Sequence, residues 1–190
     1  MTTDRPSRPR CSVFIAASLD GYIARSDGRI DWLSIAEAPG EDYGFKAFFD
    51  SVDVVVLGRK TYDTVLGFEG WPYVDKRCIV LTHRPPAPLH GEELFAGDPA
   101  TLVERLGRDG ARRAYVDGGE VITQFLKAGL IDDLTLSLIP IVLGGGRPLF
   151  GGGEPERRLS LEECRSWPTG VVQIRYRLGP GASGPGAATP

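Results

Sequence analysis

Short apolar runs alternate with segments of helical periodicity over most of the chain. Apolar runs of about four to eight residues that stop at glycine, aspartate or proline are typical of buried β-strands. These runs predict strands over residues 11–18, 52–58, 76–82, 112–119 and 133–143, the last interrupted by Pro140. Apolar positions at helical spacing predict helices over residues 41–51, 59–66, 98–110 and 120–131.

The C-terminal part follows a different pattern. Polar and apolar residues alternate over 157–167 and again over 170–178, and Pro-Thr-Gly joins the two segments. Alternation with period two around a turn predicts an antiparallel hairpin with one solvent-facing side. Strands that alternate with helices and end in a hairpin predict an α/β fold, a three-layer sandwich with a central, mostly parallel sheet and an antiparallel C-terminal hairpin.

Length and composition restrict the possibilities further. The 190 residues suit one domain, which we place at 11–178. Residues 1–10 are rich in proline and arginine, and 179–190 contain no large side chain, so both ends are predicted to be flexible tails. The net charge of −3 offers no basic field to nucleic acid or an anionic membrane. Three widely spaced cysteines and no run of transmembrane length favour a soluble protein in the reducing cytoplasm.

Cations directly follow the strand predicted over 52–58. Gly58 precedes Arg59, Lys60 and Thr61, which open the next helix. Unpaired N–H groups at a helix start, two cations and a hydroxyl together suit a phosphate group. Solvated cations on a short surface helix are the alternative interpretation.

Other strand ends add polar groups. Gly118 and Gly119 follow one predicted strand, and Thr82 and Arg84 follow or end another. Because ligands of open α/β sheets bind at the carboxyl ends of the strands, these groups favour a strip for an extended polyphosphate such as a dinucleotide. Ordinary connecting loops are the alternative. The loop over 19–29 is predicted either to fold over a bound ligand or to be a simple connection.

Three blocks of sequence resemble the dihydrofolate reductase superfamily, namely SLDGYIA, VVVLGRKTYD and VDGGEVITQFLKAGLIDDLTLSLIPIVLGGGRPLF. They occur in the order and at the spacing of that family, and the similarity covers residues 11–178. The most similar branch is the reductase domain of the bifunctional riboflavin-biosynthesis enzyme. The resemblance implies a dihydrofolate reductase-like fold with NADPH across the strand ends, where guanidinium groups would contact phosphate.

The resemblance also implies a set of cofactor contacts. These are Ala17 and Ile23 near the nicotinamide; Gly58, Arg59, Lys60 and Thr61 on the adenosine side; Thr82 and Arg84 beside the 2′-phosphate; and Gly118, Gly119, Glu120 and Val121 at the pyrophosphate. Arg59 is expected nearest the 2′-phosphate. The carboxylate of Glu120 would repel phosphate unless it points away, and it could instead satisfy N–H groups at the helix start.

The substrate side needs a proton source, because hydride transfer to a C=N or C=O group leaves charge on the nitrogen or oxygen. Asp42 and Asp31 are the predicted catalytic carboxyls, and Asp42 falls near the folate-binding acid of the family by spacing. Trp32, Phe45 and Phe49 are predicted to contact the substrate. A helix-capping role for Asp42 and a core role for the phenylalanines are the alternatives.

The resemblance implies an NADPH-dependent reductase of a pterin-like or pyrimidine-like heterocycle, of the dihydrofolate or the 5-amino-6-(5-phosphoribosylamino)uracil type. Residues 29–50 differ from the basic block with which riboflavin-pathway reductases bind a ribose phosphate, so the substrate stays open. Relatives of this branch commonly form homodimers, and no metal is expected. The alternatives are a non-catalytic NADPH- or nucleotide-binding protein and an unrelated flavin- or nucleotide-binding scaffold.

Overall fold

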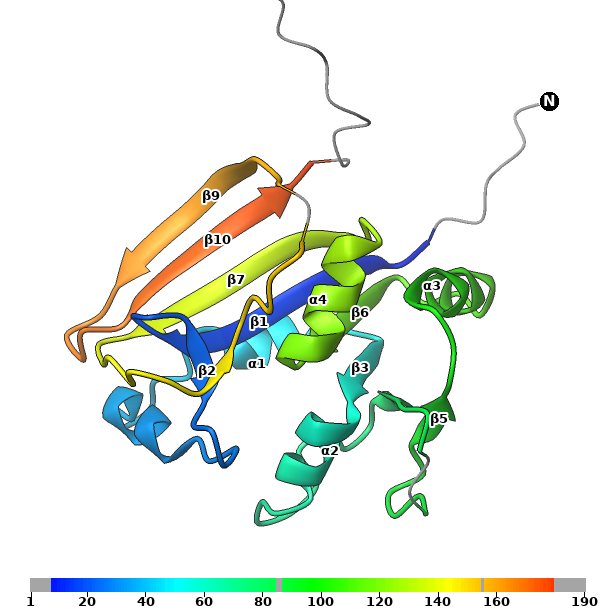
Figure 1. Ribbon diagram of the computed structural model, residues 1–190, viewed down its shortest axis with the longest axis horizontal. Coiled ribbons are helices and arrows are strands. Elements are labelled where there is room, and N and C mark those ends of the chain that lie inside the picture. Colours follow the sequence, from blue (N-terminus) through cyan, green and yellow to red (C-terminus); the bar gives the residue numbers. More distant parts are fainter. Residues whose placement is uncertain (1–7, 85–86, 155, 180–190) are drawn as a thin grey trace, which may run out of the picture.

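The computed structural model describes residues 8–84, 87–154 and 156–179 (Figure 1). Most of the two predicted tails, residues 1–7 and 180–190, lies outside these ranges. The described part contains a central sheet of eight strands in the order β5-β4-β3-β6-β1-β7-β10-β9. The predicted α/β class is confirmed, together with the mostly parallel sheet and the antiparallel C-terminal hairpin.

Neighbouring strands from β5 through β7 pair in parallel, whereas β10 is antiparallel to both β7 and β9. The strands of this sheet are β1 (Arg10–Ser18), β3 (Val54–Gly58), β4 (Arg77–Leu81), β5 (Glu93–Phe95), β6 (Arg113–Asp117), β7 (Ile131–Ile139), β9 (Leu159–Ser166) and β10 (Val172–Leu178). Two short strands, β2 (Tyr22–Ala24) and β8 (Arg147–Pro148), form a separate antiparallel pair. The carboxyl ends of β1, β3, β4 and β6 therefore lie at one edge of the sheet.

Helices cover both faces of the sheet (Figure 1). They are the 3₁₀-helix η1 (Asp31–Ala36) and the α-helices α1 (Phe45–Asp50), α2 (Arg59–Val65), α3 (Pro99–Arg108) and α4 (Gly119–Lys127). On β3, Val54 and Val56 pack in a core with α3 and α4, whereas Val55 and Leu57 pack in a second core with α1 and α2. Alternate side chains of a strand point to opposite faces, so a strand covered on both sides must be apolar throughout.

The helix boundaries test the sequence reasoning at single residues. Helix α3 begins as predicted, because the side chain of Asp98 accepts a hydrogen bond from the Thr101 N–H at 2.9 Å and Pro99 follows the cap. The helix predicted from residue 41 begins only at Phe45. Tyr43 and Gly44 have left-handed φ angles of 55° and 79°, so the preceding residues form a turn instead.

Strand β1 starts at Arg10, one residue before the predicted strand, and the guanidinium of Arg8 donates to Asp132 at 3.0 Å. The elements η1, β2, β5 and β8 were not predicted, because segments of two to six residues carry too little periodicity. Among the described residues, no helix is long and apolar enough to cross a membrane.

Candidate active site

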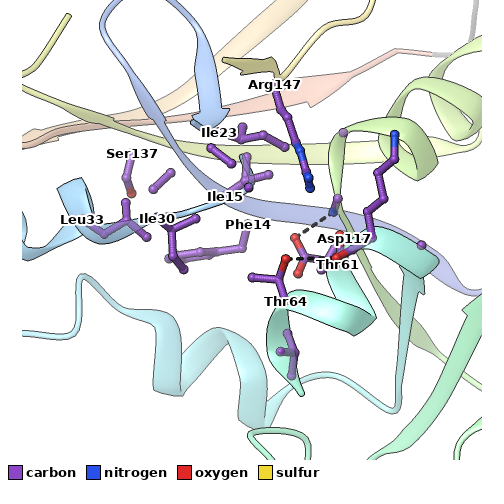
Figure 2. A pocket seen from close by; sticks show the side chains of 18 of the residues that line it. Phe14, Ile15, Ile23, Ile30, Leu33, Thr61, Thr64, Asp117, Ser137 and Arg147 are labelled. Carbon is purple, nitrogen blue, oxygen red and sulfur yellow. Dashed lines mark hydrogen bonds between the residues drawn. The ribbon is translucent and has the colours of Figure 1, made fainter. Parts of the chain in front are cut away.

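The carboxyl ends of the central strands open into a cleft of about 1040 Å³ (Figure 2). Its lining comes from β1, β3, β6 and β7, from the first turns of α2 and α4, and from the segments around β2, η1, α1 and β8. Single-ligand pockets in proteins usually measure about 300–1000 Å³. The cleft is therefore large enough for an extended ligand that touches several strand ends.

Two glycines bring the start of α4 close to its neighbours. Gly118 has a φ angle of 92°, and a Cβ at this position would lie 2.2 Å from the Thr61 Oγ1. A Cβ on Gly119 would lie 2.9 Å from the Pro148 carbonyl oxygen. Both positions therefore require glycine, because Thr61 and Pro148 already occupy the space that a Cβ would take. The first N–H groups of α4 have no acceptor within the helix.

Cations stand on two sides of this helix start. Lys60 of α2 forms an ion pair with Glu120 of α4, and the two side chains are 61% and 68% exposed. Figure 2 shows Arg147 of β8 extending from the opposite side toward the end of the cleft that contains Thr61. Positive charge at a helix N-terminus suits an anionic ligand such as a phosphate. The ion pair with Lys60 compensates the charge of the exposed Glu120 carboxylate.

Asp117, the last residue of β6, is the enclosed carboxyl of the cleft. It accepts a hydrogen bond from the Gly118 N–H at 2.8 Å, and the Tyr73 hydroxyl lies 3.4 Å from it. Tyr115 is the other aromatic neighbour, and it donates to the Phe14 carbonyl at 3.0 Å. Removal from water raises the pKa of Asp117 to about 6, although these hydrogen bonds oppose the shift. The carboxyl therefore exchanges its proton near neutral pH.

The other end of the cleft is mainly apolar. Ile30 and Leu33 lie there, with Ser137 of β7 nearby, and Phe14 lies between this end and the α2–α4 end (Figure 2). Phe45 of α1 also lines the cleft. Flat apolar walls with few polar groups are typical of sites for aromatic rings. The geometry thus combines an anion-binding end, an ionisable carboxyl and an apolar end.

The sequence model of the RibD C-terminal domain matches residues 9–173, which is most of the chain. The chain belongs to the RibD C-terminal domain family. This family lies in the dihydrofolate reductase-like superfamily, so the predicted membership is confirmed. RibD C-terminal domains are typically reductases.

Two curated relatives differ in how much of their length the chain matches. YwjB of Bacillus subtilis, an uncharacterized protein, is 37% identical over 167 residues, which cover 86% of this chain and 95% of YwjB. The riboflavin biosynthesis protein RibD of Corynebacterium ammoniagenes is 25% identical over 165 residues, which cover 73% of this chain and 45% of that protein. The chain therefore corresponds to slightly less than half of that RibD protein and to nearly all of YwjB.

Solved structures agree with this assignment. A Shewanella protein provisionally assigned to riboflavin biosynthesis superposes with a TM-score of 0.84 at 37% identity, covering 90% of this chain and 99% of that one. The Thermotoga maritima diaminohydroxyphosphoribosylaminopyrimidine deaminase/5-amino-6-(5-phosphoribosylamino)uracil reductase superposes with a TM-score of 0.69 at 16% identity, covering 90% of this chain and 57% of that one. At this identity the second match shows the RibD-like fold alone.

Most of the predicted cofactor residues of this RibD C-terminal domain lie together at the cleft. Eight of them line it: Ile23, Gly58, Lys60, Thr61, Gly118, Gly119, Glu120 and Val121. They come from β2, β3, α2, α4 and the turn before α4, which are far apart in sequence. Ala17 is 1% exposed in the core, and its neighbours Ile15 and Ala16 line the cleft in its place.

The residues predicted to contact the 2′-phosphate lie beside the cleft rather than in its wall. Arg59 donates to Asp63 at 2.7 Å and to the Arg84 carbonyl at 3.0 Å. Thr82 Oγ1 accepts from the Arg84 N–H at 3.0 Å. Arg59, Thr82 and Arg84 are thus brought together beyond the ends of β3 and β4. The Arg59 side chain is paired with Asp63 but 41% exposed, so it remains accessible to an anion.

The two predicted catalytic carboxyls have other partners. Asp42 accepts from the backbone N–H groups of Gly44 and Lys46, each at 2.9 Å, and these bonds lower the pKa of Asp42. Asp31 forms an ion pair with Arg25 at 2.8 Å, which lowers the pKa of Asp31. Asp42 lines the cleft and Asp31 does not. Both are carboxylates at neutral pH, and the contacts of Asp42 are those of the helix-start role that was its alternative.

Of the three residues predicted to contact the substrate, one lines the cleft and two pack in apolar clusters. Phe45 lines the cleft, stacked against Phe49 with ring centroids 5.7 Å apart. Phe49 itself packs against the core that contains α1 and α2. Trp32 is 2% exposed and belongs to a third apolar cluster that includes Ile139.

Sequence reasoning did not single out Asp117, Tyr73 or Arg147. Asp117 carried a usable signal, because it is a carboxyl at the end of a buried strand directly before Gly118 and Gly119. Tyr73 and Arg147 carried none, since they lie in connecting segments whose route past the cleft only the folded chain reveals.

Proposed function

We propose that the protein is an NADPH-dependent reductase that transfers a hydride to a pterin-like or pyrimidine-like heterocycle. The single observation that supports this most is the convergence of a glycine-cradled helix start and an enclosed carboxyl, Asp117, on one cleft. Membership of a family of reductases gives the reaction class.

The residues present fit the cofactor. Gly118 and Gly119 line the cleft, and because they lack a Cβ, Thr61 and Pro148 can pack against the helix start that would hold a pyrophosphate. The start of α4 and the cations Lys60 and Arg147 would hold the phosphates, and the accessible guanidinium of Arg59 would hold the 2′-phosphate. When bound, NADPH supplies the hydride.

The chain itself must then supply the proton. Asp117 has a pKa of about 6, and a general acid works best when its pKa lies near the operating pH. Negative phosphates nearby would raise this pKa further. Tyr73 holds the carboxyl in place from one side and the Gly118 N–H from the other. We therefore propose Asp117, rather than Asp42 or Asp31, as the proton donor, a role that needs the reacting atom of the substrate to lie beside Phe14, between the Gly118 turn and the apolar end.

A non-catalytic NADPH-binding protein is the second candidate. It is favoured by the engagement of both predicted catalytic carboxyls, Asp42 with backbone N–H groups and Asp31 with Arg25. Binding of NADPH without oxidation of any heterocycle would support it.

Binding of NADPH is tested first by thermal unfolding. At about 100 times its Kd, a ligand stabilises a protein by about 2.7 kcal/mol, which raises the Tm of a domain of this size by roughly 5–10 °C. Gly119→Ala should abolish this shift, because its Cβ would lie 2.9 Å from the Pro148 oxygen. Gly179→Ala is the matched control, since a Cβ there meets nothing within 4 Å.

Catalysis is tested second, by the loss of NADPH absorbance with dihydrofolate and with 5-amino-6-(5-phosphoribosylamino)uracil. No Tm shift with NADPH would contradict both candidates. A Tm shift without oxidation of either compound would leave the non-catalytic candidate in place for these substrates.

A further inference from the structure

The two ends of the cleft differ in charge. Lys60 and Arg147 line the end formed by α2, α4 and β8. The segment between η1 and α1 lines the other end and contributes Glu37, Glu41 and Asp42. Among the described residues that line the cleft, no lysine or arginine comes from this second segment. A ligand that extends from the anion-binding end therefore meets carboxylates at the far end.

Two of these carboxylates, Asp42 and Glu41, are held by hydrogen bonds. Asp42 accepts two backbone hydrogen bonds, from Gly44 and Lys46, and they lower its pKa, so it is ionised at neutral pH. Glu41 accepts a hydrogen bond from the Trp167 Nε1 at 2.9 Å. All three carboxylates are exposed at the rim of the cleft, so their field on a ligand is moderated by water, but the bonds to Asp42 and Glu41 keep those two side chains facing the same region.

The C-terminal hairpin anchors the whole segment. The Tyr43 hydroxyl lies 3.0 Å from the Thr169 Oγ1, and the Gln173 Nε2 donates to the Tyr43 carbonyl at 3.0 Å. The rings of Tyr43 and Trp167 pack edge to face at 5.1 Å. Tyr43 needs such support, because its left-handed φ of 55° is unfavourable for an aromatic residue. The segment that carries Glu37, Glu41 and Asp42, which we call the carboxylate wall, is thus tied to the turn between β9 and β10.

Apolar side chains line the same part of the cleft as these carboxylates. Phe14, Ile30, Leu33 and Phe45 line this region, and Ile139 of β7 lines it from the sheet. Such a surface accommodates a flat ring by contact and shape. These apolar contacts do not select for the charge of the ring's substituent, so that selection would come from the carboxylates.

We propose that this carboxylate wall selects an unphosphorylated substrate, a flat nitrogen heterocycle whose substituent is neutral or a protonated amine. The inference rests on the proposed function, because it assumes that NADPH occupies the cation-bearing end. A phosphate on the substituent would lie near Glu37, Glu41 and Asp42, and like charges placed together at an interface weaken binding strongly. A hydroxyl or an ammonium group would find acceptors there instead.

Two pyrimidines that differ only in the phosphate test this directly. The probes are 5-amino-6-(5-phosphoribosylamino)uracil and its dephosphorylated form, titrated calorimetrically into the full chain with saturating NADP⁺, so that no turnover occurs. The dephosphorylated form should bind at least about tenfold more tightly. Equal or tighter binding of the phosphorylated form would overturn the inference, and so would the failure of both pyrimidines to bind.

A charge variant tests whether the wall causes the preference. Glu37 suits this test, because no hydrogen bond of its side chain is found within the described residues, unlike Glu41 and Asp42. Glu37→Lys should reduce the preference by about fivefold or more, and Glu104→Lys on exposed α3 should leave it unchanged. An unchanged preference in Glu37→Lys would overturn the assignment of selectivity to the wall.

Failure of the proposed function gives a separate signal. If NADP⁺ does not bind, the reductase proposal fails. The two pyrimidines are then compared without it, and the same ratio decides the charge preference of the cleft by itself.

Discussion

Two aspartates near opposite ends of strand β6 have different partners. At its carboxyl end, Asp117 faces the cleft among neutral partners, two tyrosines and one backbone N–H. At its amino end, Arg113 contacts Asp133 of β7, which is 1% exposed. One end of the strand thus lies at a carboxyl with neutral partners and the other at a carboxyl that arginines contact.

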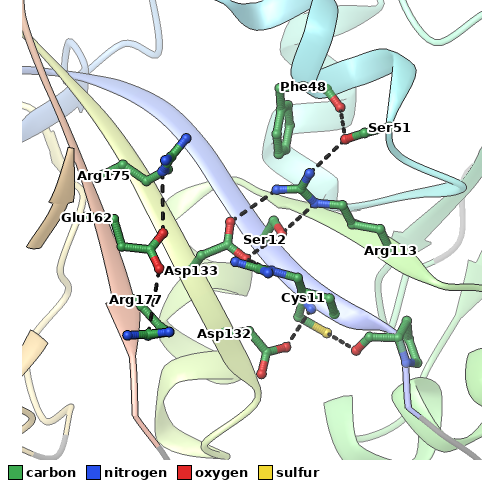
Figure 3. Close-up of polar contacts among 12 residues, drawn as sticks. Cys11, Ser12, Phe48, Ser51, Arg113, Asp132, Asp133, Glu162, Arg175 and Arg177 are labelled. Carbon is green, nitrogen blue, oxygen red and sulfur yellow. Dashed lines mark hydrogen bonds and ion pairs between the residues drawn. The ribbon is translucent and has the colours of Figure 1, made fainter. Parts of the chain in front are cut away.

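The partners of Asp133 account for the difference (Figure 3). Its oxygens accept from the Arg10 Nε at 2.5 Å, the Ser12 hydroxyl at 2.8 Å and the Arg113 Nη2 at 3.2 Å. Arg113 is itself fixed by the Ser51 hydroxyl at 2.7 Å. Two cations and a hydroxyl compensate the desolvation of one carboxylate.

The comparison shows that enclosure alone does not decide the role of a carboxyl. Asp133 is the more deeply buried of the two, yet its charge is matched and the cluster joins β1, β6 and β7. Asp117 has no cation among the partners that shift its pKa, so its proton stays exchangeable near neutral pH. We therefore expect the stability of the fold to depend on Asp133 and the proposed reaction to depend on Asp117.

The largest expected effect is on stability, from Asp133→Ala. Removing one partner of a buried ion pair leaves uncompensated charge, here on Arg10 and Arg113, and should lower the free energy of unfolding by about 3–4 kcal/mol. Urea denaturation measures this. NADPH oxidation by the fraction that remains folded should be unchanged, and a loss of activity per folded molecule would break the comparison.

The second effect is on catalysis, from Asp117→Asn. The amide keeps an acceptor for the Gly118 N–H but cannot deliver the proton, so kcat/KM should fall by about 100-fold. The KM for NADPH should change little. Asp42→Asn is the matched control and should cost far less; the reverse order would return the catalytic role to Asp42.

The third effect is on the pH dependence of stability. The pKa of Asp117 is about 6 in the folded chain and about 3.9 when unfolded, so the folded state holds more protons between these values. The stabilisation from this group is complete below about pH 4 and is lost as the pH rises through 6.

Between pH 4 and 8, the free energy of unfolding of the wild type should therefore fall by about 2 kcal/mol relative to that of Asp117→Asn. Urea denaturation at each pH measures this difference. Parallel curves for the two proteins would show that Asp117 has an ordinary pKa and is equivalent to any solvated carboxyl.

The smallest effect concerns the 2′-phosphate. Arg59→Ala should weaken NADPH binding about tenfold and leave NADH binding unchanged, because only NADPH carries the extra phosphate. Arg108→Ala, at the exposed end of α3, is the control. Equal losses for the two coenzymes would show that Arg59 serves only Asp63 and the Arg84 carbonyl.

Much of the fold was predictable, because apolar runs reveal strands that are covered on both faces. The run at 52–58 predicted β3 almost to the residue, and Asp98 with Pro99 predicted the start of α3. The helix start at Phe45 was not predictable, since the left-handed Tyr43 is tolerated only through contacts with Thr169 and Gln173 of the distant hairpin.

The sequence by itself determined the order of strands and helices and the glycines that open α4, because both depend on neighbouring residues and on which side chains can be buried. Only the tertiary structure decided which carboxyl carries a raised pKa. That depends on Tyr73, Tyr115 and the absence of a cation among the described partners of Asp117, and residues so far apart in the chain meet only when the sheet forms.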